Sequence, residues 1–495
     1  MNTNCSIILL TVILLFTHCK NEKQPSSDIR SWELNREHAK LVSKTNQSVA
    51  DAALKAEQDP LKPLFHVQPP AYWMNDPNGP IFFNGKYHLF FQHNPYGDEW
   101  GNMSWGHVVS EDLVHWERLP IALTPNPDSY DKDGVFSGCC VVYDSLPTII
   151  YTGVWPEVQC LAQSDEDMIT WFKHPQNPVI AERPRDDLEG FRDPFVWKEG
   201  ELWYMVIGSG IKGEGGTALL YKSRDLVEWE YMHPLCTGFG FNWECPIFFP
   251  LGDKWVLVVS PHGDVKYAIG DYSEYRFRPG EWQRMDFGGQ SGFYAPNCLL
   301  DANGRRIMWG WISGGGTTGY PWNGMLTLPR VLTLRADGRL DMAPLPELKA
   351  LRGKHWSYKN FTLTPDTTHI LKDAHGTCLE ILAEIDPGNA AAVTIEVLRS
   401  PDGAEKTAII YDTQNLRLIS GDHSGDFQLL PGEQYLTLHI FIDRSVVEVF
   451  ANDRACLTIR TYPKGEDSTG INLMCQKRPA KIVSLDVWEM GSIWE

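Results

Sequence analysis

Five segments of this chain share one layout: a polar or small cluster, a short apolar strand, a turn, and a second apolar and aromatic strand. Equivalent positions in the five segments are spaced by 61, 56, 51 and 51 residues. They fall at Asp76, Ser137, Asp193, Glu244 and Ala295. Turn dipeptides such as Asn-Gly, Glu-Gly and Gly-Asp separate the two strands, which predicts a hairpin in each segment. A period of this length constrains the fold more than any other feature of the sequence.

A second marker recurs behind the first three hairpins. It reads SEDLVHWE from Ser110, SDEDMITWF from Ser164 and SRDLVEWE from Ser223. Two markers with one period indicate about four strands per unit, which is typical of a β-propeller blade. We therefore predict a five-bladed β-propeller over residues 61–346.

Beyond residue 346 the markers stop. Alternating apolar residues continue, most clearly in TLHIFIDRSVVEVF (437–450). Several short strands of this kind predict a separate antiparallel β-sandwich over residues 355–495. The fold class is thus all-β, a five-bladed propeller followed by a sandwich.

The N-terminus has the character of an export signal. Residues 1–19 contain an apolar run that is too short to span a bilayer. Leu15-Phe16-Thr17-His18-Cys19 loosely resembles a bacterial lipoprotein cleavage site, so Cys19 is a candidate for a lipid anchor. We expect export, either as a secreted protein or as a cell-surface or periplasmic lipoprotein. Residues 20–60 are predicted as a linker, with a polar helical or loosely ordered lead-in from residue 31 to 58.

Composition excludes several classes of partner. The formal net charge is −19 and no basic run occurs, which argues against nucleic acid and against anionic membranes. No Cys/His cluster has metal-ligand spacing, so we predict neither a metal nor another cofactor. The only predicted membrane link is the candidate anchor on Cys19.

Three of the five equivalent positions are carboxylates. In a propeller the first strand of each blade lines the central axis, so Asp76, Asp193 and Glu244 are predicted to share one pocket. Each is followed by Pro directly or one residue later. Any one of these sequences alone is better explained as a turn signal, but three at matched repeat positions favour a common site.

Paired carboxyls are the usual machinery for hydrolysing a glycosidic bond. One carboxylate attacks or activates water, while the other protonates the leaving oxygen. Repulsion between like charges in one pocket separates their pKa values and makes this division possible. A third carboxylate can stabilise the transition state.

The motifs WMNDPNG (73–79), FRDP (191–194) and WECP (243–246) resemble the signatures of glycoside hydrolase family 32. FSG (136–138), WNGMLTLPR (322–330) and IFIDRSVVEVF (440–450) also match that family. The resemblance implies a retaining β-fructosidase, with Asp76 as nucleophile, Glu244 as general acid/base and Asp193 as transition-state stabiliser. It further implies an exo-acting enzyme on levan or inulin that also takes sucrose.

The same resemblance implies a set of substrate-binding residues. Asn75 and Gln92 would bond fructose hydroxyls, Trp73, Trp100 and Phe136 would form an apolar wall, and Ser137 and Arg192 sit at binding positions. Trp322 would floor the pocket. One departure from the family pattern is Ile247, at a position where relatives carry a polar residue and which we expect on the leaving-group side. The adjacent Cys139 and Cys140 have no explanation from the sequence.

Three alternatives remain open at this point. A five-bladed hydrolase acting on arabinan or xylan would invert configuration, and the WMNDPNG motif and the sandwich weigh against it. A sucrose-specific invertase or a fructosyltransferase of the same family would keep the same three acids. A non-catalytic sugar-binding protein would be expected to have lost at least one of them. The choice among levan, inulin and sucrose depends on loops that the sequence does not place.

Overall fold

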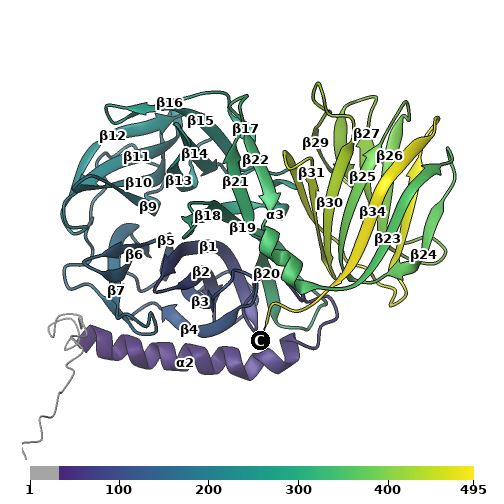
Figure 1. Ribbon diagram of the computed structural model, residues 1–495. Helices are drawn as coiled ribbons and strands as arrows, with labels where there is room; N and C mark the ends of the chain where they lie inside the picture. The colour runs from purple at the N-terminus through teal and green to yellow at the C-terminus, as the bar shows by residue number, and fades with distance from the viewer. Residues whose placement is uncertain (1–32, 495) are drawn as a thin grey trace, which may run out of the picture.

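Five antiparallel blades surround one axis in the computed structural model, which describes residues 33–494 (Figure 1). Blades two and three are four-stranded sheets, and blade four carries a fifth short strand. Blade two comprises β5 (Gly134–Tyr143), β6 (Leu146–Val154), β7 (Val158–Ser164) and β8 (Trp171–Lys173). Blade three comprises β9 (Arg192–Glu199), β10 (Leu202–Ile211), β11 (Gly215–Ser223) and β12 (Trp229–Thr237). Blade four comprises β13 (Glu244–Leu251), β14 (Lys254–Ser260), β15 (Lys266–Ser273), β16 (Arg276–Pro279) and β17 (Gln283–Arg284).

Blades one and five are joined in a single sheet that closes the ring. Blade one contains β1 (Tyr72–Phe83), β2 (Lys86–Asn94), β3 (Ser104–Ser110) and β4 (Glu117–Leu123). Blade five contains β18 (Tyr294–Leu300), β19 (Arg306–Gly315), β21 (Arg330–Leu334) and β22 (Leu340–Pro344). Strand β20 (Trp322–Leu326) pairs with β19 and also runs parallel to the start of β1. The short helix α3 (Gly289–Gly292) precedes β18. The predicted five-bladed propeller is confirmed.

The Trp-containing markers form tight turns that end the third strand of a blade. In blade one, Ser110 and Asp112 accept hydrogen bonds from the backbone N–H groups of residues 112–115. Ser223 and Asp225 do the same in blade three. Trp116 and Trp171 are buried, which agrees with a packing role for these tryptophans.

The described part of the segment before the propeller is largely helical, which is one of the two states expected for the lead-in. Residues Glu33–Ala56 form helix α2, which lies along the edge of β4 (Figure 1). The Asn35 side chain bonds both backbone groups of Lys173, and His38 accepts the N–H of Thr124. Asn46 accepts the N–H of Ile121. Because an outer strand leaves backbone groups unpaired, these polar side chains satisfy donors that the sheet cannot. The predicted signal (1–19) and Cys19 lie outside the described residues.

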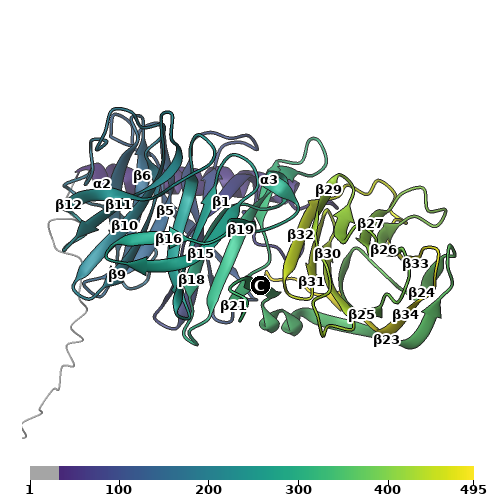
Figure 2. The same cartoon turned by 90° about the horizontal axis from the view of Figure 1, so that it is seen from above.

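After the 3₁₀ helix η1 (Pro346–Leu351), two six-stranded sheets form the predicted β-sandwich beside the propeller (Figure 2). One sheet holds β23 (Arg352–Leu363), β34 (Ala480–Met490), β25 (Cys378–Asp386), β30 (Leu436–Asp443), β31 (Val446–Ala451) and β32 (Ala455–Arg460). The other holds β24 (His369–His375), β33 (Gly470–Cys475), β26 (Ala392–Arg399), β27 (Thr407–Asp412), β28 (Arg417–Ser420) and β29 (His423–Asp426). Aliphatic side chains from both sheets fill its core.

A buried ionic network joins the two domains. Arg330 of the propeller contacts Asp286 at 2.8 Å and the sandwich residue Glu448 at 2.9 Å. His66 bonds Asp443 at 2.8 Å and Glu448 at 3.2 Å. All these side chains are almost completely buried, so each charge depends on its partner. This network fixes the sandwich against blades one and five.

Among residues 33–494, no helix combines the length and the apolar character that crossing a bilayer requires. The nine cysteines in this range are all free thiols, and eight of them are buried.

Candidate active site

The inner strand of every blade carries a β-bulge at the predicted site position or directly after it. In each, two residues of the inner strand lie opposite one residue of the second strand. The bulged pairs are Asn75-Asp76, Phe136-Ser137, Asp193-Pro194, Cys245-Pro246 and Ala295-Pro296. Proline, which has no N–H to give to the ladder, is the second residue of the bulged pair in blades three, four and five. The repeat thus places a local distortion near the predicted position of all five inner strands.

Asp76 is held by three neighbours from two other blades and its own strand. Ser137 Oγ donates to Asp76 Oδ2 at 2.5 Å, and Asn75 Nδ2 donates to Oδ1 at 2.9 Å. Trp73 Nε1 in turn donates to Asn75 Oδ1 at 2.8 Å, which fixes the amide. Cys245 Sγ lies 3.4 Å from Asp76 Oδ2. Both carboxylate oxygens of Asp76 are therefore oriented before any ligand arrives.

Cys245 links Asp193 to Asp76. Its backbone N–H donates to Asp193 Oδ2 at 2.9 Å, and its thiol lies 3.6 Å from the same oxygen. The thiol touches both aspartates, so carboxylates from blades one and three share one sulfur from blade four. Asp193 has a φ of +63°, and the Thr152 hydroxyl accepts its N–H at 3.0 Å. Such a left-handed conformation in a non-glycine residue is a strained feature typical of functional sites.

Glu244 is oriented by a cation and a phenol. Arg192 Nη2 donates to Oε1 at 2.8 Å, and the Tyr294 hydroxyl donates to Oε2 at 2.7 Å. His262 Nε2 lies 3.7 Å from Oε1. The other side of Arg192 is bound to the buried Glu157 at 2.6 Å. Glu244 is about one-fifth exposed, so it faces the pocket while its own position is fixed.

Burial and like charge control the protonation of this cluster. Burial raises the pKa of Asp76, while hydrogen bonds from Ser137 and Asn75 lower it and the charge of Glu244 raises it. Burial likewise raises the pKa of Asp193 to about 7, with Arg192 opposing and Asp76 and Glu244 adding to the rise. The negative charge of Glu244 therefore acts on both aspartates and favours their protonated forms. Residues 76, 193 and 244 thus lie at one site, as the repeat predicts.

An aromatic row borders the carboxylates. Trp100 meets Phe136 edge to face at 6.0 Å, and Phe136 meets Trp155 in the same way at 5.9 Å. Trp100 and Trp155 are more than half exposed. Trp73 packs against Trp311 at 5.7 Å on another side of Asp76. These faces form an apolar surface beside the carboxylates, of a kind suited to packing against a ring-shaped ligand.

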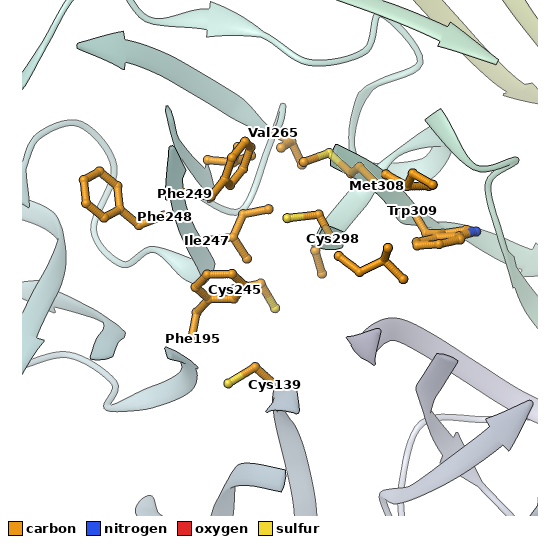
Figure 3. Packing of buried hydrophobic residues seen from close by; sticks show 14 of the residues in the cluster. Cys139, Phe195, Cys245, Ile247, Phe248, Phe249, Val265, Cys298, Met308 and Trp309 are labelled. Atoms are coloured by element: carbon orange, nitrogen blue, oxygen red, sulfur yellow. The ribbon is translucent and has the colours of Figure 1, made fainter. Parts of the chain in front are cut away.

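Three sequence-based expectations need revision or refinement. Trp322 does not floor the pocket: it is buried, and its indole donates to Asp59 Oδ2 at 2.8 Å between α2 and blade five. Ile247 does not reach a leaving-group surface, because it packs in the core among Phe195, Cys245 and Cys298 (Figure 3). Gln92 is buried opposite the Asn75-Asp76 bulge, and its amide donates to Val135 O at 3.0 Å. Its carbonyl oxygen is the part left for a ligand.

Several residues of the site were not found from sequence. Five side chains contact the predicted residues without having been predicted themselves: Glu157, Cys245, Tyr294, Trp155 and His262. Cys245 and Tyr294 lie next to the repeat positions at 244 and 295, so the repeat itself could have identified them. Glu157 and His262 lie in loops with no repeat signal. Cys139 and Cys140 prove to be packing residues on the inner strand of blade two (Figure 3 shows Cys139).

Little empty space remains between the inner strands beside the carboxylates. A cavity of about 10 Å³ lies between Ser137, Asp193 and Cys245, which is room for one water at most. No group of three or more His, Cys, Asp or Glu side chains suited to a metal ion occurs within residues 33–494. The site is therefore built from carboxylates and the aromatic faces beside them.

Comparison with known families decides the class. The sequence model described as "Glycosyl hydrolases family 32 N-terminal domain" matches residues 66–344, and its C-terminal counterpart matches residues 347–489. The chain belongs to glycoside hydrolase family 32. As a member of family 32 it is a glycoside hydrolase that acts on β-fructofuranosides.

Individual relatives within family 32 agree with this assignment. The chain is 36% identical over 479 residues to a sucrose-6-phosphate hydrolase of Escherichia coli, covering 87% of this chain and 95% of that one. It is 33% identical over 508 residues to a levanase of Bacillus subtilis, covering 90% and 73% respectively. The crystal structure of fructan 1-exohydrolase IIa from Cichorium intybus superposes with a TM-score of 0.81 at 27% identity, covering 88% of this chain and 98% of that one.

Proposed function

We propose that this chain is a retaining, exo-acting β-fructosidase that releases terminal β-D-fructofuranosyl units from levan or inulin and from sucrose. The observation that carries the proposal is the joint contact of Cys245 with Asp76 and Asp193, beside the oriented Glu244. Three acids at one pocket mouth match the chemical needs of glycoside hydrolysis.

In the proposed reaction Asp76 attacks the anomeric C2 of the fructosyl unit. Ser137 and Asn75 stabilise its ionised form, which opposes the effect of burial. Glu244 protonates the leaving oxygen and then removes a proton from the incoming water. Asp193 accepts hydrogen bonds from hydroxyl groups of the sugar and stabilises positive charge at the transition state.

Exo action is supported by the name of a similar solved structure, a fructan 1-exohydrolase. Substrate choice is supported by relatives that are named as a levanase, a raffinose invertase and sucrose-6-phosphate hydrolases. A sucrose-specific invertase and a fructosyltransferase would use the same acids and differ in the acceptor or the leaving sugar.

The test compares purified protein on sucrose, sucrose 6-phosphate, inulin and levan side by side. We expect free fructose as the sole product from both fructans, and a first-formed product with the β configuration. Longer oligosaccharides at high sucrose would identify a fructosyltransferase. Turnover of sucrose 6-phosphate alone would contradict the fructan proposal.

We further propose export through residues 1–19, with lipidation at Cys19 as the route to the cell surface. Fractionation of cells producing the wild type and Cys19→Ala tests this. The wild type should partition with membranes and the variant with the soluble exported fraction. Equal distribution of the two proteins would contradict lipidation.

A further inference from the structure

Phe241 is an exposed aromatic side chain that folding does not explain. It is 55% exposed, and it stacks on the imidazole of His262 with ring centroids 4.8 Å apart and planes 19° apart. Phe241 belongs to the loop before β13 and His262 to the loop after β14, so both lie at the open end of the blade-four hairpin. An exposed aromatic ring held in one orientation can stack on a ligand.

The pair lies beside the acid that releases the leaving group. His262 Nε2 is 3.7 Å from Glu244 Oε1. Of the side chains that contact Glu244, His262 is the most exposed, at 34% against 16% for Arg192. Tyr294 is buried. The surface that continues outward from Glu244 is therefore the face of His262 and Phe241.

Both side chains are fixed by their backbones. The N–H of His262 donates to the Tyr294 hydroxyl at 3.0 Å, and that hydroxyl also contacts Glu244. Gly210 lies so close to the Phe241 carbonyl that a Cβ at position 210 would collide with it. The next residues, Asn242 and Trp243, are buried. The stacked pair of Phe241 and His262 is therefore held in place before a ligand binds, which lowers the entropic cost of binding.

We infer that Phe241 and His262 form the binding site for the leaving sugar, with Phe241 stacking on its apolar face and His262 bonding a hydroxyl. The inference rests on the proposed function, because it needs Glu244 to face the leaving oxygen. In that reaction the nucleophile and the general acid act on opposite sides of the anomeric carbon, so the leaving unit lies toward Glu244. An aromatic face with one polar neighbour is suited to a pyranose or furanose ring.

The experiment compares two substrates that share a fructosyl unit. Sucrose carries a leaving sugar, and methyl β-D-fructofuranoside carries only methanol. For Phe241→Ala the ratio of kcat/KM on sucrose to that on the methyl fructoside should fall about ten-fold, mainly through KM. Phe241→Tyr keeps the ring and should keep the ratio near that of the wild type. His262→Asn, which tolerates the φ of +58° at this position, should lower the ratio several-fold.

Tyr275→Asn provides the matched control. Tyr275 is another exposed aromatic of blade four, stacked on Tyr204 at 5.5 Å between the outer strands β15 and β16. This variant should leave the ratio unchanged. Equal losses on both substrates for Phe241→Ala, or no loss on either, would overturn the inference while leaving the proposed function intact. A wild type that hydrolyses neither substrate would overturn both.

Discussion

Ser137 Oγ lies 2.5 Å from Asp76 Oδ2, although 61 residues separate the two along the chain. The hydroxyl donates to the carboxylate across the boundary between blades one and two. Since a hydrogen bond to the ionised form favours that form, Ser137 lowers the pKa of a carboxyl that burial raises. A hydroxyl of blade two thus helps to keep the Asp76 carboxyl of blade one ionised.

Ser137→Ala should raise the pKa of Asp76, so that less of it is ionised at acidic pH. The acidic limb of the kcat/KM profile is then expected to move to higher pH, with a larger loss of rate near about pH 5 than near neutrality. Ser223→Ala removes a buried hydroxyl in a turn of blade three and should leave the profile in place. An unchanged acidic limb in Ser137→Ala would show that this hydroxyl does not control the nucleophile.

Arg192→Gln should lower kcat about 10²-fold with a smaller change in KM, because Glu244 loses the cation that orients it. Arg183 bonds the same Glu157 but does not reach Glu244. Arg183→Gln should therefore lower kcat by no more than about three-fold. If Arg192→Gln raised only KM, Arg192 would be a substrate-binding residue and not a positioning residue.

Trp322→Phe should destabilise the protein without weakening substrate binding. The change removes the indole donor to Asp59, a buried carboxylate that also accepts two hydrogen bonds from Thr317. Leaving a buried acceptor with one partner fewer costs about 1–3 kcal/mol. The expected result is a lower Tm and an unchanged KM for sucrose. A raised KM at normal Tm would place Trp322 back in the pocket.

The domain interface should weaken at alkaline pH. Burial alone would lower the pKa of His66, but Asp443 and Glu448 raise it to about 9. The folded state therefore holds this proton more tightly than the unfolded chain, where the pKa is about 6.5. The resulting stability, on the order of 3 kcal/mol, is present below about pH 6.5 and is lost as the pH rises toward 9.

Thermal unfolding of the wild type between about pH 6.5 and pH 9 tests this, with His66→Gln as the comparison. The wild-type Tm should fall more steeply over this range than that of the variant. Parallel curves would show that another group dominates the alkaline loss.

The sequence predicted the fold and the three acids because both depend on one repeat. A period of 50–60 residues places every inner strand at the axis, and matched positions then converge whatever the loops do. Trp322 was misplaced because a tryptophan beside a signature motif carries no information about which side of the strand it faces. Asp59, which binds it, comes from a segment with no repeat signal.

Residues in the turns between strands could not be predicted for the same reason. Glu157 reaches Arg192 from the β6–β7 connection, and His262 reaches Glu244 from the β14–β15 connection. Their positions depend on tertiary packing between blades, which local patterns do not encode. Helix α2 was a weak prediction because its contacts with blades one and two are polar side-chain bonds to backbone groups, and such bonds leave no apolar periodicity.

The central claim is that Asp76, Asp193 and Glu244 act together on one fructosyl unit, with Asp76 as nucleophile. Glu244→Gln, exposed briefly to a β-fructoside with a good leaving group, should accumulate a fructosyl ester because the proton acceptor for water is missing. Digestion and mass spectrometry should find the added fructosyl group on the peptide that contains Asp76, and Asp76→Ala should carry none and show no turnover. A label on another carboxylate, or near-normal turnover by Asp76→Ala, would contradict the account.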